Sequence, residues 1–353
     1  MNTRPVFLKL SLAVLIVLLP FLLYEIWDVV EAARLRSRVD ALKASGAPIV
    51  FYMPSIGGAE RAARYYRAAA ALASNDSYTA LSIEERNRTW KALRAGNDWT
   101  PEVVRVAKLR VEQNREALEF VDRAAALPFT AFPPGTSYNY LAADLMRLAQ
   151  VCEFRAAVLA AEGRGDDAAA SLYSEARLAR ALDLVSASPW ISTVPAFTNI
   201  ASILARVRPS AAALDRLSGG LESLDRDDRM KQAFIRSRAL MLNDVTISRP
   251  PSRQPAPLFA HLIVRSLDAF ATIIAAADQP WPARVSAVTA VGIWPQPDIF
   301  TLGTRGSKML ADYTRALADQ VKRIRCARLS VERTLALVDP FTGQRLEMLN
   351  CRF

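Results

Sequence analysis

The most apolar stretch of the chain lies near its amino terminus. From Leu10 to Tyr24, only Ser11 and Pro20 interrupt a run of apolar side chains. The segment from Val6 to Trp27 has about the length that is needed to cross a bilayer core of roughly 30 Å. Proline is better tolerated in a membrane helix than in a soluble one. The pattern predicts a transmembrane anchor over residues 1–27.

A cleaved signal peptide is the alternative interpretation of this segment, because Arg4 and Lys9 give it a basic start. The apolar run is followed at once by Glu25–Asp28, which makes a poor cleavage region. Tyr24 and Trp27, in contrast, suit the aromatic belt of a membrane surface. We therefore expect an uncleaved signal-anchor.

The charges on the two sides of the anchor bear on its orientation. Arg4 and Lys9 favour a cytoplasmic amino terminus, whereas the basic residues between Arg34 and Lys43 favour the opposite orientation. Long domains translocate largely regardless of charge. We expect a single-pass protein of the cell inner membrane, with its main domain on the periplasmic or outer side.

After the anchor, apolar residues recur with the spacing of amphipathic helices. Residues 28–44 are polar and rich in arginine, and they predict a juxtamembrane helix that ends near Gly46. Thr100 and Pro101 supply an N-cap and a first-turn proline for another helix. We expect that helix to continue without a break to about Ala126.

The clearest pattern is a pair of apolar stripes with steps of three and four residues. The first stripe contains Leu141, Leu145, Leu148, Cys152, Ala156 and Leu159. The second contains Leu172, Ala176, Ala179 and Leu182. Gly163-Arg164-Gly165 separates them, and Asp166 caps the second helix. Two amphipathic helices joined by such a turn predict an antiparallel helical hairpin.

Together these elements predict an all-α fold, in which an N-terminal transmembrane helix is followed by a tetratricopeptide-like array of helical hairpins. The chain divides into five predicted parts. They are a transmembrane anchor (residues 1–27), a juxtamembrane helix (28–48), a helical-hairpin domain (49–248), a proline-rich linker (249–257) and a C-terminal helical region with a DPFTG tail (258–353). In the last region we expect an apolar helix over 258–277 and an irregular segment over 279–306. A long final helix from Lys308 to about Leu335 follows.

Composition limits the chemistry of the chain. The formal net charge is +10, but only seven of the 45 basic residues are lysine, and no aromatic residues interleave with a basic stripe. Codon bias explains this better than a specific nucleic-acid partner does. The single histidine, His261, lies in an apolar helical stretch and reads as structural. We predict no catalytic, cofactor-binding or metal-binding residues, no cofactor, and no small-molecule ligand.

The carboxylates around the hairpin are the groups that an enzyme would use here. They are Glu153, Glu162, Asp166, Asp167 and Glu175. We assign all of them to solvent-facing or capping positions. The basic residues of the final helix, Lys322, Arg323, Arg325 and Arg328, are likewise assigned to a solvated face.

Three cysteines leave two interpretations open. Cys152 lies on an apolar helical stripe, and we expect a buried, unreactive thiol. Cys326 lies on the final helix, and a tail that folds back along it could bring Cys351 within disulfide distance. An oxidising compartment would favour that bond, whereas a domain that faces the cytoplasm would keep both as free thiols.

Several stretches carry a resemblance to a known family. They are Ala62-Ala63-x-x-Tyr66, Leu145-x-x-Leu148-Ala149, Gly165-Asp166, Leu178-Ala179-x-x-Leu182, Pro189-x-Ile191 and Asp339-Pro340-Phe341-Thr342-Gly343-Gln344-Arg345-Leu346. The sequence resembles a family of uncharacterised bacterial membrane proteins that end in a DPF[ST]G-type motif. The resemblance implies a membrane anchor and a tetratricopeptide-like helical domain. It implies no activity and no catalytic residues.

The leading functional hypothesis is a non-enzymatic, membrane-anchored protein of the bacterial envelope that binds another protein or serves as a scaffold. Helical-hairpin arrays expose extended grooves for such partners. One alternative is an accessory component of a secretion or pilus-like system, which the terminal motif suggests. Another is an envelope enzyme that uses the carboxylates of the hairpin.

Overall fold

The structure is a computed structural model of the 353-residue chain. It describes residues 4–49, 59–73, 84, 88, 91–92, 99–128, 138–185, 200–226, 228–247, 257–291, 304–333, 335–347 and 351. Within these ranges, the side chains of 4–17, 59–60, 138–140, 184–185, 229, 240, 243–247, 257–259, 304–311 and 313 are not described. The predicted all-α class is confirmed, because the described part contains helices and one isolated antiparallel bridge, between Val338 and Arg345.

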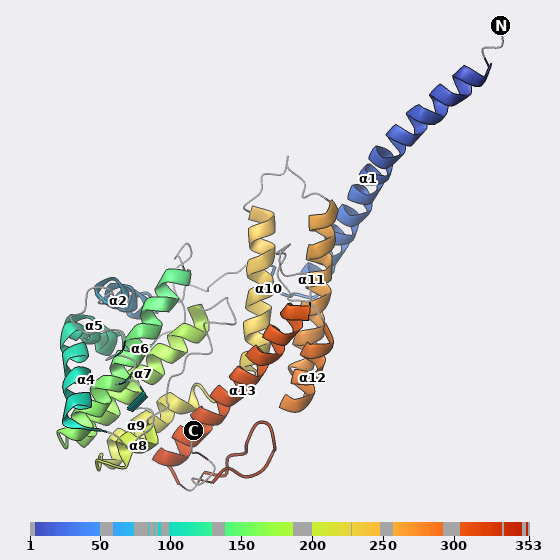
Figure 1. The fold of residues 1–353 in the computed structure, drawn as a ribbon. Helices are drawn as coiled ribbons and strands as arrows, with labels where there is room; N and C mark the ends of the chain where they lie inside the picture. Colours follow the sequence, from blue (N-terminus) through green and yellow to red (C-terminus); the bar gives the residue numbers. More distant parts are fainter. Residues whose placement is uncertain are drawn as a thin grey trace. The chain divides into compact units, whose positions relative to one another are not determined.

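Figure 1 shows the helices along the chain. They are α1 (Arg4–Ala44), α2 (Ala59–Leu72), α4 (Pro101–Gln113), α5 (Arg115–Ala125), α6 (Tyr138–Ala161), α7 (Gly165–Val185), α8 (Ile200–Leu204), α9 (Ala211–Glu222), α10 (Arg229–Ile247), α11 (Pro257–Ala276), α12 (Trp281–Val291) and α13 (Thr304–Val331).

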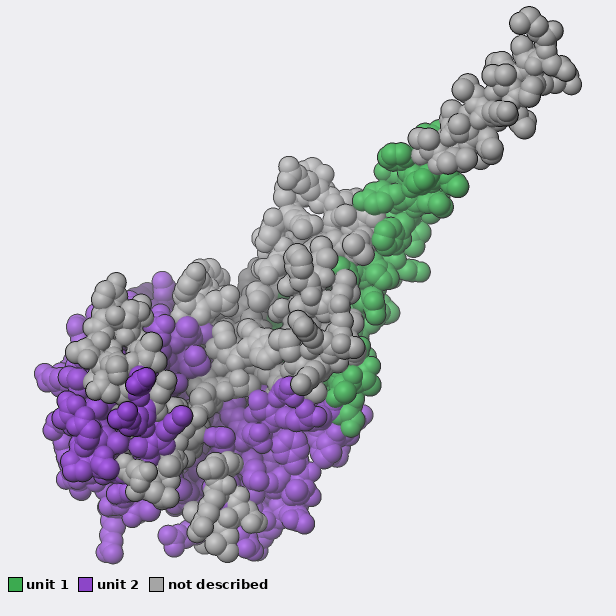
Figure 2. Space-filling view, viewed as in Figure 1, with its two compact units in different colours: residues 1–51, 234–278, 286–311 green, residues 52–233, 279–285, 312–353 purple. Residues whose placement is uncertain are grey.

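The chain forms two compact units, which Figure 2 distinguishes by colour. Unit 1 comprises residues 1–51, 234–278 and 286–311, and unit 2 comprises residues 52–233, 279–285 and 312–353. The boundaries of these units fall inside α10, α12 and α13, so they differ from the domain boundaries that we predicted, which stay a prediction. The predicted proline-rich linker lies outside the described residues, except that its last residue begins α11.

The long helix α1 changes its surroundings along its length. Its side chains are described from Leu18 onward, and the large apolar ones up to Val30 are exposed by between 39% and 68%. Within the described part of the chain, no helix is both long and apolar enough to cross a membrane. The side chains of residues 1–17, which make up most of the predicted anchor, lie outside that part.

In unit 1, α1 lies beside α11 (Figure 1). Glu31 Oε1 lies 3.3 Å from Nδ1 of His261, and Arg38 Nη2 lies 2.8 Å from Oδ1 of Asp268. The Glu31 carboxylate is buried and also accepts a hydrogen bond of 2.9 Å from Nη1 of Arg34. His261 therefore sits at a helix-to-helix contact.

The predicted apolar helix over 258–277 is present as α11. Phe270 of α11 packs edge-on against Phe234 of α10, with ring centroids 6.3 Å apart. The prediction of an irregular segment over 279–306 is wrong in part, because α12 forms there. Its Pro282 falls in the first turn, where the missing N–H costs no intrahelical hydrogen bond. The preceding Trp281 is buried under the guanidinium of Arg284, 4.3 Å away.

In unit 2, α6 and α7 form the predicted antiparallel hairpin. The side chains of both predicted stripes are buried, except for Leu159, which is half-buried. Each leucine that is removed from water here contributes about 1.5–3 kcal/mol to folding. The turn is closed by hydrogen bonds from Gly163 N–H to Ala160 O and from Arg164 N–H to Leu159 O. Gly163 has φ +75°, a left-handed conformation that a helix end commonly assigns to glycine.

The single helix that we predicted from Pro101 to Ala126 is wrong, because the chain forms α4 and α5 with a break at Asn114. The Asn114 side chain donates a hydrogen bond of 2.9 Å to the carbonyl of Arg110, and its backbone N–H donates to Val111 O instead. Asparagine competes with regular helical hydrogen bonding in this way. After the break, α5 packs against α2.

Candidate functional site

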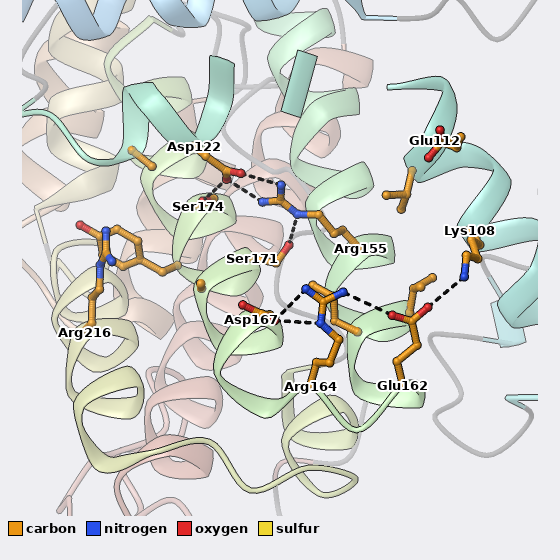
Figure 3. Close-up of a pocket in the computed structure, with 16 residues that line it drawn as sticks. Lys108, Glu112, Asp122, Arg155, Glu162, Arg164, Asp167, Ser171, Ser174 and Arg216 are labelled. Carbon is orange, nitrogen blue, oxygen red and sulfur yellow. Dashed lines mark hydrogen bonds and ion pairs between the residues drawn. The ribbon is translucent and has the colours of Figure 1, made fainter. Parts of the chain in front are cut away.

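A cleft of about 590 Å³ lies in unit 2, and α4, α5, α6, α7 and α9 contribute its walls (Figure 3). Its lining mixes small apolar side chains with charged groups of both signs. The lining residues are Lys108, Val111, Glu112, Asp122, Ala125, Arg155, Val158, Leu159, Glu162, Arg164, Asp167, Ala170, Ser171, Tyr173, Ser174 and Arg216.

The centre of the cleft is a hydrogen-bond network around Arg155 of α6. Its Nη1 and Nη2 donate to the two carboxylate oxygens of Asp122, each over 2.7 Å, and its Nε donates to Oγ of Ser171 over 2.8 Å. Oγ of Ser171 donates in turn to the carbonyl of Cys152, and Oγ of Ser174 donates to Asp122. Figure 3 shows this convergence of α5, α6 and α7.

The pair of Arg155 and Asp122 links two helices and also exposes part of a carboxylate to the cleft. The Arg155 side chain is only 17% exposed, while that of Asp122 is 48% exposed. Burial acts to lower the pKa of Arg155, but the hydrogen bonds and charge of Asp122 raise it above its usual value. The guanidinium therefore stays charged, and it ties α5 to the hairpin while one face of the carboxylate remains open to the cleft.

A second chain of charges crosses the hairpin turn. Lys108 Nζ lies 3.0 Å from Oε1 of Glu162, and Arg164 contacts both Glu162 and Asp167, at 3.5 and 2.8 Å. The hydrogen bond from Lys108 lowers the pKa of Glu162 below its usual value, against an opposing effect of burial. These pairs are largely exposed, so each adds little to stability, but together they set a row of alternating charges along the cleft.

An aromatic platform forms the other side of the cleft. The guanidinium of Arg216 on α9 lies over the ring of Tyr173, 4.4 Å from its centroid. The ring also lies close to Gly220, where an added Cβ would be 3.0 Å from Tyr173 Cδ2. A stacked guanidinium and ring present a flat surface with donors at its edge, which suits planar or anionic groups of a ligand.

The structure confirms the predicted positions of three hairpin carboxylates and contradicts those of the other two. Glu162 and Asp167 line the cleft, and Asp166 accepts a hydrogen bond from the Ser210 N–H over 2.5 Å, so these three are at exposed or capping positions. Glu153 and Glu175 are buried, 1% and 0% exposed, and their predicted exposure is wrong. They lie beside the apolar stripes, because the buried faces of α6 and α7 are wider than the stripes that we read from the sequence.

Sequence reasoning missed most of the groups that define the cleft. Asp122, Ser174 and Arg155 come from three helices, and Arg216 comes from a fourth. None of them belongs to a recognisable local motif, and 33 positions separate Asp122 from Arg155. The only available signal was the position of Arg155 next to an apolar stripe, which a charged residue occupies at a cost unless it has a partner.

Two of the three cysteines are bonded to each other and the third is a free thiol. A disulfide joins Cys326 to Cys351, whose Cα atoms lie 5.5 Å apart. Cys152 is a free thiol and fully buried, and desolvation raises its pKa to about 12. At neutral pH this thiol stays protonated and does not act as a nucleophile.

The terminal motif forms a tight turn beside α13. The Asp339 carboxylate accepts hydrogen bonds from the N–H groups of Phe341 and Thr342, and Lys322 Nζ lies 2.8 Å from its Oδ2. Gly343 adopts φ +68° and donates its N–H to the carbonyl of Asp339. The motif is thus locally self-stabilised and held to the helix by a salt bridge.

The predicted solvated face on α13 is wrong for two of its members. The side chains of Arg325 and Arg328 are 11% and 13% exposed, and both contact Asp225, at 3.0 and 2.5 Å. Arg325 also donates to the carbonyl of Val338 in the tail. These arginines are therefore internal cross-links of unit 2.

Comparisons of this chain with known protein families, with curated proteins and with solved structures found no match. The family resemblance therefore stays an expectation from the sequence. Among the residues that the structure describes, no three histidine, cysteine, aspartate or glutamate side chains are grouped so that they could hold a metal ion.

Proposed function

We propose that this protein is a non-enzymatic, membrane-anchored protein of the bacterial envelope that binds another protein through the cleft of unit 2. One observation carries the membrane part of the proposal: large apolar side chains are exposed on every side of α1 between Leu18 and Trp27. They are Leu18, Leu19, Phe21, Leu22, Leu23, Tyr24, Ile26 and Trp27.

The distribution of these side chains around the helix distinguishes lipid from a protein partner. Successive residues of an α-helix are about 100° apart, so the eight apolar positions within this short segment cover its whole circumference. A docked protein covers one face of a helix, whereas lipid surrounds it. A helix that is apolar all round belongs in a large core or in a membrane. This supports the single span over residues 1–27.

The protein-binding part of the proposal rests on the cleft. Its walls are helices of a hairpin array, which we propose to be tetratricopeptide-like, and such arrays bind extended segments of other proteins. The charged groups are already held in place by their mutual contacts, so binding costs little side-chain entropy. The row of alternating charges and the Arg216 platform suit a polar segment that carries charges of both signs.

The disulfide supports an assignment to one side of the membrane. Bonds such as Cys326–Cys351 persist in the periplasm and outside the cell, and cytoplasmic reductants remove them. We therefore propose that the main domain lies on the periplasmic or outer side of the inner membrane.

The membrane part is tested by flotation of the purified full chain with lipid vesicles, followed by alkaline carbonate washing. The wild-type chain should float and resist the wash. The triple variant Leu19→Asp, Leu22→Asp, Leu23→Asp should remain soluble, because each substitution adds a charge to the segment that enters lipid. Wild-type protein that stays with the soluble fraction would contradict the anchor.

The partner is sought by affinity capture from detergent-solubilised membranes, using two matched arginine variants. Arg216 lies over Tyr173 in the cleft, and Arg206 lies over Trp99 in the same unit but does not line the cleft. A partner of the cleft should be lost with Arg216→Glu and retained with Arg206→Glu. Equal retention by both variants would place the interaction elsewhere.

A further inference from the structure

The surface of α1 changes in character at Asp28. All residues from Leu18 to Trp27 are exposed, on every side of the helix. Beyond that point one stripe becomes less exposed than the rest and recurs with steps of three and four residues. The stripe consists of Asp28, Glu31, Ala32, Leu35, Val39 and Leu42. From Asp28 onward, therefore, one side of α1 is covered by protein.

The distribution of charge changes at the same point. Between Leu18 and Trp27 the only ionisable acid or base is Glu25, apart from the tyrosine. Between Asp28 and Ala44 there are seven charged residues: Asp28, Glu31, Arg34, Arg36, Arg38, Asp40 and Lys43. Charged side chains are rare at membrane depth and common in the adjoining water.

Helix α11, which covers one side of α1, starts level with the change of surface at Asp28. The contacts Glu31–His261 and Arg38–Asp268 have the same offset of 230 positions (261 − 31 and 268 − 38), so α1 and α11 run parallel in a constant register. By this register, Pro257, the first residue of α11, lies level with Trp27. The exposed apolar segment thus lies just beyond the start of α11.

The first contacts that α1 makes after Asp28, on the side toward its carboxyl end, are ionic. The Glu31 side chain is only 3% exposed, and it contacts both Arg34 and His261. The guanidinium of Arg34 and that of Arg38 are more than half exposed and face solvent. Such a cluster belongs on the water side of a membrane surface, while Tyr24 and Trp27 belong at the surface itself.

We propose that the boundary between lipid and water crosses α1 at Trp27 and Asp28, so that the packing of α11 against α1 begins directly at the membrane surface with no spacer. This inference rests on the proposed anchor, and it adds the position along α1 at which the helix leaves the lipid. The occupant of the apolar segment is the hydrocarbon of the bilayer, and the surface that meets the headgroups is the first turn of α11 together with the adjoining turn of α1.

The boundary is tested with single cysteine substitutions on exposed positions of α1 in the full chain. Leu22→Cys and Ile26→Cys lie above the proposed boundary, and Ala33→Cys and Ser37→Cys lie below it. Every variant also carries Cys152→Ala, because the free thiol of Cys152 is buried in the folded chain but would react in denaturant, and the other two cysteines are bonded. Each variant is reconstituted into vesicles and labelled with a membrane-impermeant maleimide, then labelled again after solubilisation in denaturant.

Positions 22 and 26 should react at least about ten times more slowly in vesicles than in denaturant, because a thiol in hydrocarbon does not form the reactive thiolate. Positions 33 and 37 should react at similar rates in both. Protection that extends to position 33, or free reaction at position 26, would overturn the boundary. The same labelling of Phe21→Cys and Leu23→Cys samples other faces of the helix, and free reaction at either of them beside protection at 22 and 26 would overturn the span, because it would show a helix lying along the surface. Failure of every variant to float with vesicles would instead contradict the anchor itself.

Discussion

The α6–α7 hairpin and the segment from Asp312 in α13 to the tail both belong to unit 2, but different forces hold them. The hairpin is closed by apolar side chains, among them Leu145, Leu148 and Leu172, which are fully buried. The α13 segment is closed by polar and covalent cross-links. These are the disulfide of Cys326, the two arginines on Asp225, and the Lys322–Asp339 salt bridge.

The difference shows what sets the strength of each region. Apolar burial is non-directional and adds up over many contacts, so a hairpin with long stripes is insensitive to most single changes outside its core. Buried ion pairs and a disulfide depend on a few groups, and the loss of one partner leaves the other without compensation. The tail has only a small apolar cluster of its own, in which Leu346 packs with Leu329 and Cys326.

The largest effect is expected when the apolar seam of the hairpin receives a charge. Leu148 is 0% exposed, and Leu148→Asp places an unpaired carboxylate among apolar side chains. We expect a loss of several kcal/mol, enough to unfold unit 2. Thermal unfolding followed by circular dichroism measures it. Ala161→Asp, at the exposed end of the same helix, should change stability by less than about 1 kcal/mol, and equal melting temperatures for the two variants would mean that the buried face is misassigned.

The next largest effect is expected at the ionic cross-link. Asp225→Asn removes the buried carboxylate that Arg325 and Arg328 share, which is expected to cost about 3–5 kcal/mol. Arg328 keeps a longer contact of 3.7 Å with the exposed carboxylate of Glu222. Urea unfolding gives the free energy. The matched control is Asp312→Asn, because the Asp312–Arg315 pair is exposed on both sides and should contribute less than about 1 kcal/mol. A loss at Asp225 no larger than in the control would show that the tail is held by other contacts.

The disulfide is expected to contribute about 3 kcal/mol, since it closes a loop between residues 25 positions apart. Dithiothreitol should lower the melting temperature of the wild-type protein and leave that of the Cys326→Ser, Cys351→Ser variant unchanged. Mass-tagging of unreduced protein should detect no thiol in the native state and one after unfolding. Three thiols after unfolding would mean that the bond does not form in the cell.

The smallest expected effect is the dependence of the tail on acid. Burial acts to raise the pKa of Asp339, but the hydrogen bonds from Lys322, Thr342 and Phe341 outweigh it and hold the pKa below its usual value. The carboxylate therefore stabilises the fold above the unfolded-state pKa of about 3.9, and this contribution is lost as the pH falls through the lower folded-state pKa. Asp339→Asn should remove this part of the acid sensitivity below about pH 4. An unchanged profile of melting temperature against pH would assign the sensitivity to other groups.

The sequence predicts the hairpin well because the relevant information is local. Steps of three and four between leucines identify a buried face, and Gly163 marks the turn between two helices. The break at Asn114 was missed because its cause is one side-chain hydrogen bond, which outweighs a favourable apolar period. Helix α12 was missed because Pro280 and Pro282 stand at its start and proline commonly breaks a helix, although it is tolerated in the first turn.

The cleft and the cross-links of α13 were harder to predict, because they depend on pairs that are distant in the sequence. Arg325 and Arg328 have the spacing of an exposed basic face, and only the approach of Asp225, about a hundred positions earlier, makes them internal. The partnership of Asp122 with Arg155 is of the same kind. Periodicity assigns a residue to a face of its helix, but it contains no information on which distant charge meets that face.

The covalent ring between Cys326 and Cys351 has a consequence for how the chain responds to proteolysis. The tail exposes Arg345 between the two cysteines, so a trypsin-like protease can cut there. Such a cut opens the ring without separating the pieces, since the disulfide still joins them. The clipped protein would run as one chain on a denaturing gel without reductant and would release a short carboxy-terminal peptide only after reduction. A nick in this exposed turn is therefore silent until the redox conditions change.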